Sequence, residues 1–384
     1  MNWRNYLLGA FGFALAIMFW PGQAGAAEPS RWAFLAASVP IGLFAISIKP
    51  DKVLWLILAL LGWSALTFLW ADVFYDAANW WFGLVLLAGC FAIGHELGDL
   101  DWFYKGVAVG LIAQLPICVL QAFHYYPVIA VMPDGQALPS GLFVNPSMLG
   151  EACAPVAVVM LVKRQWLWAA GVAAVLLLSQ NRSGIISFGL CSLLWVALQN
   201  RRMIWLAILT AAPVAYLGLI KGVDPFSSLT QRVDIWKDAW AGFVPLGHGI
   251  GQFYVDFPMH NDAIMSEVSP TWVLTAHAHN DILEWAFELG IPGLILIGAI
   301  AFIVFRNPRA TEGFGLFAIC ITAMVGFPWH MPFTAAVGAI MAGYATRARD
   351  LVRGDVLHSG SMVYGRRQFA RAVEPIESLP TVPA

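Results

Sequence analysis

Residues 53–71 read Val-Leu-Trp-Leu-Ile-Leu-Ala-Leu-Leu-Gly-Trp-Ser-Ala-Leu-Thr-Phe-Leu-Trp-Ala, without one charged side chain. As a helix this run is about as long as the roughly 30 Å hydrocarbon core of a bilayer is thick. Similar apolar runs recur along the chain, and they are too long for the strands of a membrane barrel. The sequence therefore predicts an all-α fold, a polytopic transmembrane helix bundle.

Composition agrees with a bilayer as the solvent of this chain. Of the 384 residues, 60% are hydrophobic and only 11% are charged, and the mean hydropathy is +0.72. Such a mixture excludes an ordinary water-soluble domain. We predict twelve spans, at residues 5–20, 32–48, 53–71, 79–95, 105–123, 147–163, 166–180, 184–199, 203–220, 281–305, 313–329 and 332–346.

The first span also has features of a cleaved signal peptide. Arg4 precedes it, and small residues follow at positions 24–27, as at a cleavage site. We keep it as a helix because an even number of spans places both termini on one side, which the loop charges can test.

Positive charge is strongly biased toward the side that carries both termini. Sixteen Lys and Arg fall on that side of the predicted topology and five fall opposite, namely Arg31, Arg182, Lys221, Arg232 and Lys237. Because cytoplasmic loops are enriched in these residues, we expect both termini to lie in the cytoplasm.

The spans also suggest how the chain is divided. Residues 1–346 form the predicted transmembrane domain, which includes a large periplasmic loop subdomain at 221–280, between spans nine and ten. Residues 347–384 read as a basic, disordered cytoplasmic tail held near anionic membrane lipids. We expect no nucleic-acid partner, and the net charge of −2 is uninformative about partners.

The long periplasmic loop collects polar residues. Its segment 229–242 places Val233, Trp236 and Trp240 at helical spacing, which predicts an amphipathic helix lying on the membrane surface. The loop ends at His277-Ala-His279-Asn280-Asp281-Ile-Leu-Glu284, where Asp281 and Glu284 match a capping box. Glu288 lies one turn deeper and must face protein or water, since a charge in lipid costs about 3 kcal/mol.

Four basic or titratable groups on the predicted periplasmic side could meet in one pocket: Arg182, Arg232, His277 and His279. For Arg182 alone, an arginine that reaches the lipid headgroups is an equally good interpretation. For His277 alone, a structural hydrogen bond is a better interpretation than catalysis. One pocket built from three loops would explain all four.

These residues stand within motifs that resemble the O-antigen ligase and polysaccharide polymerase superfamily. The motifs, in chain order, are Gly141-Leu-Phe143-Val-Asn145-Pro146, Arg182 after a Ser-rich span end, Arg232 with Trp236, Gly247-His-Gly-Ile-Gly251-Gln-Phe253, His279-Asn280, and Glu288-Leu-Gly290-Ile-Pro-Gly293. They cover roughly residues 140–295. Ser147 departs from the pattern, because relatives commonly have a second Asn there.

The resemblance implies a metal-independent, inverting transfer of a glycan from undecaprenyl pyrophosphate to a lipid or glycan acceptor, such as lipid A-core, in the periplasm. Arg182 and Arg232 are candidates to bind the leaving diphosphate, because guanidinium stays charged and binds phosphate oxygens in a fork. Imidazole suits the base, with His279 our first choice and His277 the second. Asn145, Asn280 and Glu288 are further substrate-binding candidates, and we expect no cofactor.

Several alternatives stay open at this level. Asp99-Leu-Asp101 and His277-Ala-His279 could each suggest a metal, but neither has the partners that such sites need, and we predict none. A Wzy-type polymerase would use the same donor as a ligase. A transporter or flippase would need polar residues along its spans, where Gln114, Gln121 and Glu151 are among the few. A scaffold without chemistry would leave the arginines and histidines unexplained.

Overall fold

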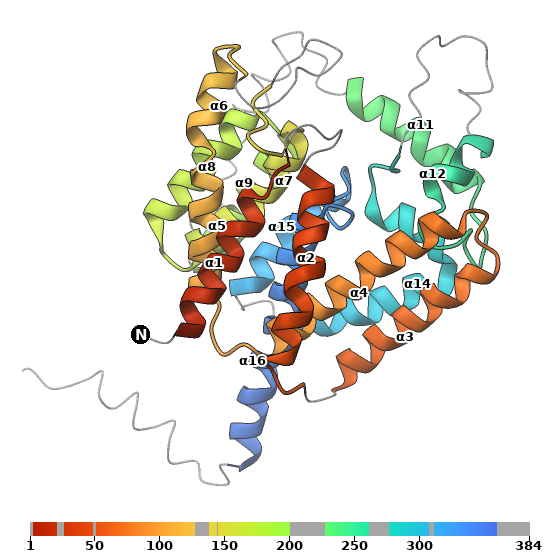
Figure 1. Cartoon of the computed structure of the whole chain (residues 1–384), viewed down its shortest axis with the longest axis horizontal. Coiled ribbons are helices and arrows are strands. Elements are labelled where there is room, and N and C mark those ends of the chain that lie inside the picture. The colour runs from red at the N-terminus through yellow and green to blue at the C-terminus, as the bar shows by residue number, and fades with distance from the viewer. Residues whose placement is uncertain are drawn as a thin grey trace, which may run out of the picture. The chain divides into compact units, whose positions relative to one another are not determined.

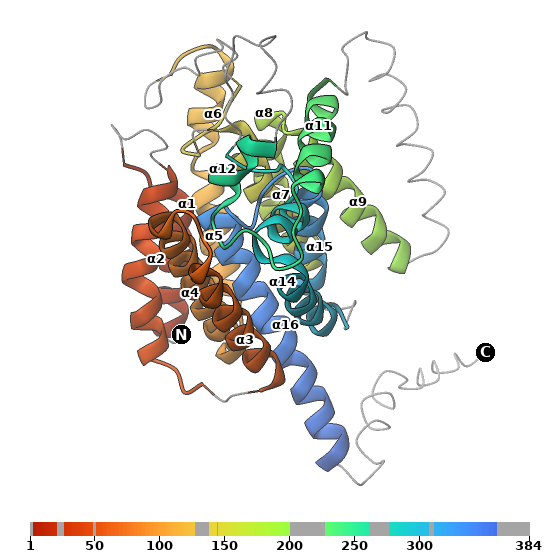
Figure 2. The same cartoon turned by 90° about the vertical axis from the view of Figure 1, so that its right-hand side faces the viewer.

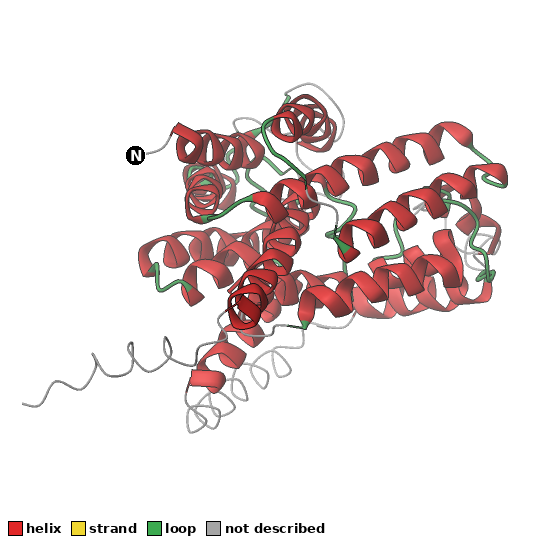
Figure 3. Cartoon of the chain, turned by 90° about the horizontal axis from the view of Figure 1, so that it is seen from below, coloured by secondary structure: helices red, strands yellow, loops and turns green. Residues whose placement is uncertain are grey.

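The computed structural model describes residues 3–20, 27–48, 51–126, 138–143, 145–199, 227–260, 276–306 and 311–358. These residues fold into helices and connecting loops, and no strand occurs among them (Figure 3). The chain divides into two units, residues 1–346 and 347–384. The all-helical prediction is confirmed for the part of the chain described.

The helices run in the order α1 (Trp3–Ile17), α2 (Ala27–Phe44), α3 (Lys52–Leu66), η1 (Thr67–Leu69), α4 (Phe74–Glu96), α5 (Asp101–Ile112), α6 (Leu115–Ala122), α7 (Pro146–Val162), α8 (Trp166–Ser179), α9 (Arg182–Gln199), α11 (Ser227–Ala241), α12 (Phe253–Asp256), η2 (Phe257–His260), α14 (Asp281–Phe305), α15 (Thr311–Ala323) and α16 (Pro332–His358) (Figure 1).

Each predicted span except the ninth coincides with a helical segment, the fifth being broken into α5 and α6. The ninth, at 203–220, lies outside the described residues. Five helical segments among those described are long and apolar enough to cross a membrane: Lys52–Leu69, Phe74–Glu96, Asp101–Ala122, Arg182–Gln199 and Asp281–Phe305. The total of twelve crossings stays a prediction. Because α16 continues to His358, the predicted tail starts as helix rather than as disordered chain.

Close glycine packing joins the first helix to the bundle. A Cβ on Gly106 of α5 would lie 1.9 Å from the Gly9 carbonyl oxygen of α1, and one on Gly12 would lie 2.6 Å from the Phe103 carbonyl oxygen. Small residues let helix backbones approach in this way within membranes. The α1 helix therefore belongs to the packed bundle as described.

Buried polar side chains bind the last carbonyls of α1 and the backbone of the 138–143 loop. Arg31 of α2 donates to the carbonyls of Leu15 and Ala16, both at 3.1 Å, and its guanidinium lies 3.7 Å from the Phe143 ring centroid. Gln114, at the α5–α6 break, donates to Ala16 O at 3.2 Å and accepts from the backbone of the 138–143 loop. The carbonyls of Leu15 and Ala16 lie at a helix end, where they have no partner within the helix. Arg31 and Gln114 supply the missing donors.

The α14 helix is kinked, and the loop before α12 inserts at the kink. Gly290 breaks the helix with φ 63° and ψ −162°. The carbonyls of Phe287 and Glu288 accept from the backbone of His248 and Gly249, both at 2.9 Å. Neighbouring backbone thus replaces the helical hydrogen bonds lost at the kink, as burial in an apolar setting demands.

The α3 helix lies beside this kinked helix, and α4 packs on α3 (Figure 1). Trp63 of α3 donates its indole N–H to Leu289 O at 2.8 Å, and Trp70 donates to Gly247 O at 2.9 Å. The glycine motifs around residues 247–251 and 290–293 therefore have a structural reason, since they allow two backbones to touch.

We expect Gly290→Ala to destabilise the protein by roughly 2–4 kcal/mol, because of the left-handed backbone and crowding. The added Cβ would lie 2.3 Å from the Pro245 carbonyl oxygen. Thermal unfolding in detergent measures the effect. Gly298→Ala in the same helix is the matched control, because its Cβ meets no atom within 4 Å; equal melting temperatures for the two variants would contradict the assignment.

Candidate functional site

The segment 276–280 is held between α11 and the start of α14. The N–H of Ala278 donates to Glu284 Oε2 at 2.8 Å, and its carbonyl accepts from the Trp236 indole of α11 at 2.9 Å. The α11 and α12 helices both pack on α14 (Figure 2). Because Ala278 is fixed on both sides, His277 and His279 project from a defined backbone.

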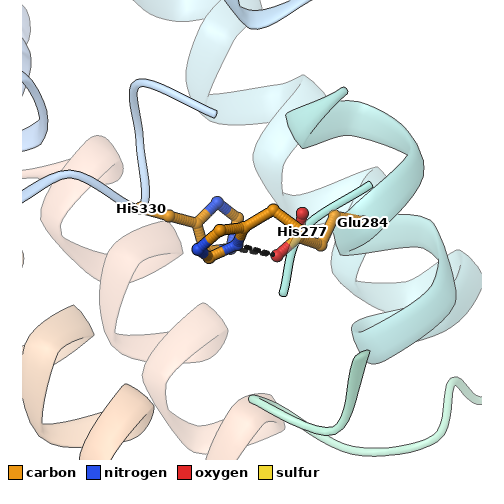
Figure 4. Close-up of side chains that lie close together, drawn as sticks. All are labelled: His277, Glu284 and His330. Carbon is orange, nitrogen blue, oxygen red and sulfur yellow. Dashed lines mark hydrogen bonds and ion pairs between the residues drawn. The ribbon is translucent and has the colours of Figure 1, made fainter. Parts of the chain in front are cut away.

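Glu284 is the centre of a cluster of titratable side chains. Its Oε1 lies 2.8 Å from His277 Nδ1 and 3.3 Å from His330 Nε2. Figure 4 shows these three side chains converging from the 276–280 segment, the first turns of α14 and the loop before α16. The Glu284 and His330 side chains are buried, and that of His277 is 14% exposed.

Asp281 completes the cluster from the same helix. Its Oδ1 lies 2.6 Å from His330 Nδ1, and its Oδ2 accepts from the Trp329 N–H at 3.1 Å. Burial alone would lower the pKa of His330, but the carboxylates of Glu284 and Asp281 outweigh this and raise it to about 10. His330 is therefore an imidazolium between two carboxylates at neutral pH.

Aromatic rings form walls around this cluster. The His277 ring stacks on Phe327 at 4.3 Å between centroids, and the His279 ring contacts the same phenyl ring at 5.1 Å. Trp80 of α4 presents an edge to His277 and His330, at 5.9 and 5.0 Å. Rings in these positions limit the access of water to the charges.

Arg232 of α11 contacts the loop that carries His330. Its Nη1 donates to the Val325 carbonyl, in the loop that carries His330. Burial lowers the pKa of Arg232, while the charge of Glu151 on α7 opposes that shift. Glu151 in turn lies against Gly326, because a Cβ there would be 2.2 Å from its Oε1. The loop 324–331 thus contacts α7, α11 and α14.

His279 has an unusual backbone and a weakened basicity. Its φ is 52°, in the left-handed region that non-glycine residues enter rarely and often at functional sites. Burial and then the charge of Arg232 lower the pKa of His279 to about 4. This imidazole is therefore neutral throughout the physiological range.

The remaining predicted site residues occupy positions of their own. Asn280 caps α14, with Oδ1 accepting from Leu283 N at 3.1 Å, and Asn145 caps α7, accepting from Ser147 N at 2.8 Å. Glu288 is buried and accepts from Phe253 N at 3.1 Å. Arg182 is the exposed first residue of α9. Arg232, His277 and His279 all contact the loop 324–331, and the catalytic and binding roles of all the predicted residues stay predictions.

An apolar cavity of about 440 Å³ adjoins the cluster. It lies among α3, α4, α14, α15 and α16, and its wall includes Trp80, Trp285, Glu288, Trp329 and His330. Two members of the polar region thus border a space that is otherwise lined by apolar and aromatic side chains. Such a space fits a hydrocarbon chain whose polar end lies near the cluster.

A metal ion could be held by three of these residues. One ligand atom each from His277, Glu284 and His330 lies within 4.8 Å of the others. Without an ion, Glu284 accepts a hydrogen bond from His277 and forms an ion pair with His330, so the carboxylate has partners within the protein.

Sequence reasoning missed His330 and misassigned several contacts nearby. Asn280 caps α14, and Asp281 and Glu284 bind the imidazoles and the Trp329 and Ala278 N–H groups instead of forming the predicted capping box. The predicted topology offered one signal for His330. Its loop, between the last two predicted spans, falls on the same predicted side of the membrane as the loop 221–280.

The predicted helix around 229–242 is confirmed as α11, and its position on the membrane surface stays a prediction. Ala239 is buried, while Trp240 is 65% exposed and stacks on Phe243. Trp236 binds protein backbone. Its side chain therefore serves to hold the 276–280 segment, which differs from the headgroup position predicted for it.

Together the apolar helices and this site define a multi-pass membrane protein with a centre of buried carboxylates and imidazoles beside a partly buried guanidinium. Residues 167–298 match the model of the O-antigen ligase family, which confirms the resemblance seen in the motifs. The matched region contains Arg182, Arg232, His277 and His279, and ends before His330. No curated protein matches the chain.

The lowered pKa of His279 predicts its reactivity. Diethyl pyrocarbonate modifies neutral imidazole, so we expect the modification rate of His279 to stay flat from pH 8 down to about 5 and to halve at about pH 4. Arg232→Gln should shift this midpoint upward, because a nearby cation is removed. Peptide mass spectrometry measures both. Lys237→Gln is the control, since Lys237 is exposed on the same helix; a midpoint near 6.5 in the native protein would refute the prediction.

Proposed function

We propose that this protein is a lipid-linked glycan transferase of the O-antigen ligase type. It moves a glycan from undecaprenyl pyrophosphate to an acceptor such as lipid A-core, on the periplasmic face of the bacterial inner membrane. The observation that carries the proposal is the meeting of Arg232, His277 and His279 in the family-matched part of the chain, next to an apolar cavity.

The reaction needs a cation for the leaving group and a base for the acceptor. The acceptor hydroxyl oxygen forms a bond to the anomeric carbon as the bond from that carbon to the diphosphate oxygen breaks, and the electron pair stays on the diphosphate. Arg232 suits the developing charge because donors placed where charge builds up lower the barrier. An imidazole of the 277–279 pair takes the hydroxyl proton.

A single displacement accounts for inversion at the anomeric carbon, and no step in it requires a metal. A retaining route would use a carboxylate nucleophile. Glu284 is a poor candidate, because both of its oxygens accept hydrogen bonds within the protein.

The apolar cavity suits the carrier lipid. An isoprenoid tail would bury its surface against the cavity wall, while the diphosphate stays near the polar cluster. The same arrangement argues against a transporter, because the buried Gln114 and Gln121 serve the 138–143 loop backbone rather than form a polar path.

We expect the purified protein to transfer glycan in the presence of EDTA. His279→Ala and Arg232→Ala should each lower the rate by roughly 10²-fold or more, measured by gel separation of donor and product. Lys237→Ala should retain activity. Wild-type rates in both site variants, with folding shown by size-exclusion chromatography, would remove this mechanism.

Deletion of the gene separates a ligase from a polymerase, which uses the same donor. A ligase deletion leaves long polymer on its carrier and lipid A-core without polymer, as seen by lipopolysaccharide gel analysis. Products capped with a single repeat unit would instead assign the protein as a polymerase.

A further inference from the structure

We propose that the groove between α1, α5 and α8 binds one anionic phospholipid of the surrounding membrane, with its acyl chain along the floor of the groove and its phosphate at Lys105. The groove has a volume of about 570 Å³, within the roughly 300–1,000 Å³ of sites that hold one small ligand. Among the residues that the structure describes, it shares none with the wall of the apolar cavity beside the titratable cluster. This site is therefore separate from the proposed transferase site.

The floor of the groove lies where two helices touch. The α1 and α5 helices pack side by side, and α8 packs on α5 (Figure 1). A Cβ on Gly106 of α5 would lie 1.9 Å from the Gly9 carbonyl oxygen of α1. Gly9 has no side chain and is nevertheless partly exposed, so space remains on the outer side of this contact. An acyl chain can cover such a floor closely.

Apolar side chains continue the groove along both helices. On α1, Phe13 follows Gly9 after one turn. On α5, Val109 follows Gly106 after one turn, and Trp168 closes the groove from α8. Residues three and four positions apart lie on the same face of a helix, so the walls form one apolar strip. Because bilayer hydrocarbon is as apolar as these side chains, the strip alone selects no particular lipid.

Aromatic rings mark one end of the groove as the head-group level of the membrane. Tyr6 of α1 contacts Trp102 of α5 with 5.5 Å between the ring centroids. The Lys105 ammonium lies 5.3 Å from the centroid of the Trp102 ring, and Trp3, one turn before Tyr6, is 63% exposed. Trp and Tyr collect at membrane–water interfaces. The groove therefore runs from the head groups into the hydrocarbon.

Positive charge is concentrated at the same end. Lys105 lines the groove, and Arg4 belongs to the first turn of α1. Of the two acids at the start of α5, Asp101 forms an ion pair with Lys163, and Asp99 accepts from the Asp101 N–H. The three cations outnumber these two acids, so the head-group end is positive. An anionic head group complements this charge, whereas a zwitterionic one has no net charge to offer.

The asymmetry of the groove favours a lipid over a helix from a second copy of the chain. A helix would run along the whole groove and cover Lys105, and a covered charge in the membrane needs a partner. A phospholipid has its charge at one end and hydrocarbon along the rest, which matches the order of Lys105 and the apolar strip. A ligand bound to the folded form also stabilises it, so we expect the lipid to reinforce the packing of α1.

Lipid cross-linking and affinity measurements test this site, and neither requires transfer activity. Full-length protein in phosphatidylcholine nanodiscs would receive a small fraction of phosphatidylglycerol with a photoreactive acyl chain. Peptide mass spectrometry should place the cross-links within residues 3–13, 102–109 and 166–168. In native mass spectrometry, phosphatidylglycerol should bind more tightly than phosphatidylcholine, and Lys105→Gln should weaken phosphatidylglycerol alone by about fivefold.

Two further variants complete the test. Lys52→Gln is the matched control and should keep the wild-type affinity, because Lys52 is an exposed cation at the start of α3, away from the groove. Ala10→Phe fills the groove from an exposed position, so it should lower the cross-linking yield while size-exclusion chromatography shows folded protein.

Three results would overturn the proposal: equal affinities for the two lipids, equal losses in Lys105→Gln and Lys52→Gln, or cross-links that map outside α1, α5 and α8. A concentration-dependent dimer that Ala10→Phe dissociates would also overturn it, because the groove would then be a contact between copies of this chain. If Ala10→Phe does not fold, the comparison of Lys105→Gln with Lys52→Gln still decides.

Discussion

The Glu284 carboxylate joins three parts of the chain that are remote in sequence. It binds the His277 ring, the Ala278 N–H and the His330 ring, and it does so from a buried position on α14. A buried charge is tolerated only when it is paired and hydrogen-bonded. Removing one partner of such a pair typically costs 3–5 kcal/mol, so the fold must bring the 276–280 segment and the loop 324–331 to this helix together.

The kink at Gly290 makes that meeting possible. Glu284 lies six positions before Gly290 in α14, and the segment before α12 fits into the break by backbone hydrogen bonds. Glu288 ties the same region to the start of α12 through Phe253 N. The end of α14 that carries the charged residues is therefore fixed on one side by inserted backbone and on the other by Trp236 of α11.

The sequence predicted the helices well because long apolar runs have few other solutions in a bilayer. It also predicted the importance of residues 277–288, since titratable groups beside an apolar run must find partners. The role of His330 could not be read in the same way, because its partners lie 46 and 49 positions earlier and no periodicity links them. The burial of Ala239 of α11 against Phe257 and Phe287 could not be read from the sequence for a related reason, because its partners lie in other segments and the apolar periodicity of α11 marks larger side chains.

The position of the cluster beside an apolar cavity has an electrostatic consequence. Charges interact more strongly where water is excluded, so the pairing of His330 with Asp281 and Glu284 is reinforced by the apolar wall that Trp80, Trp285 and Trp329 provide. A strongly held imidazolium in turn keeps Glu284 oriented toward His277. In the proposed transfer, the surface that suits a hydrocarbon tail would thus also hold the catalytic groups in place, and it would keep water away from a donor that water could otherwise hydrolyse.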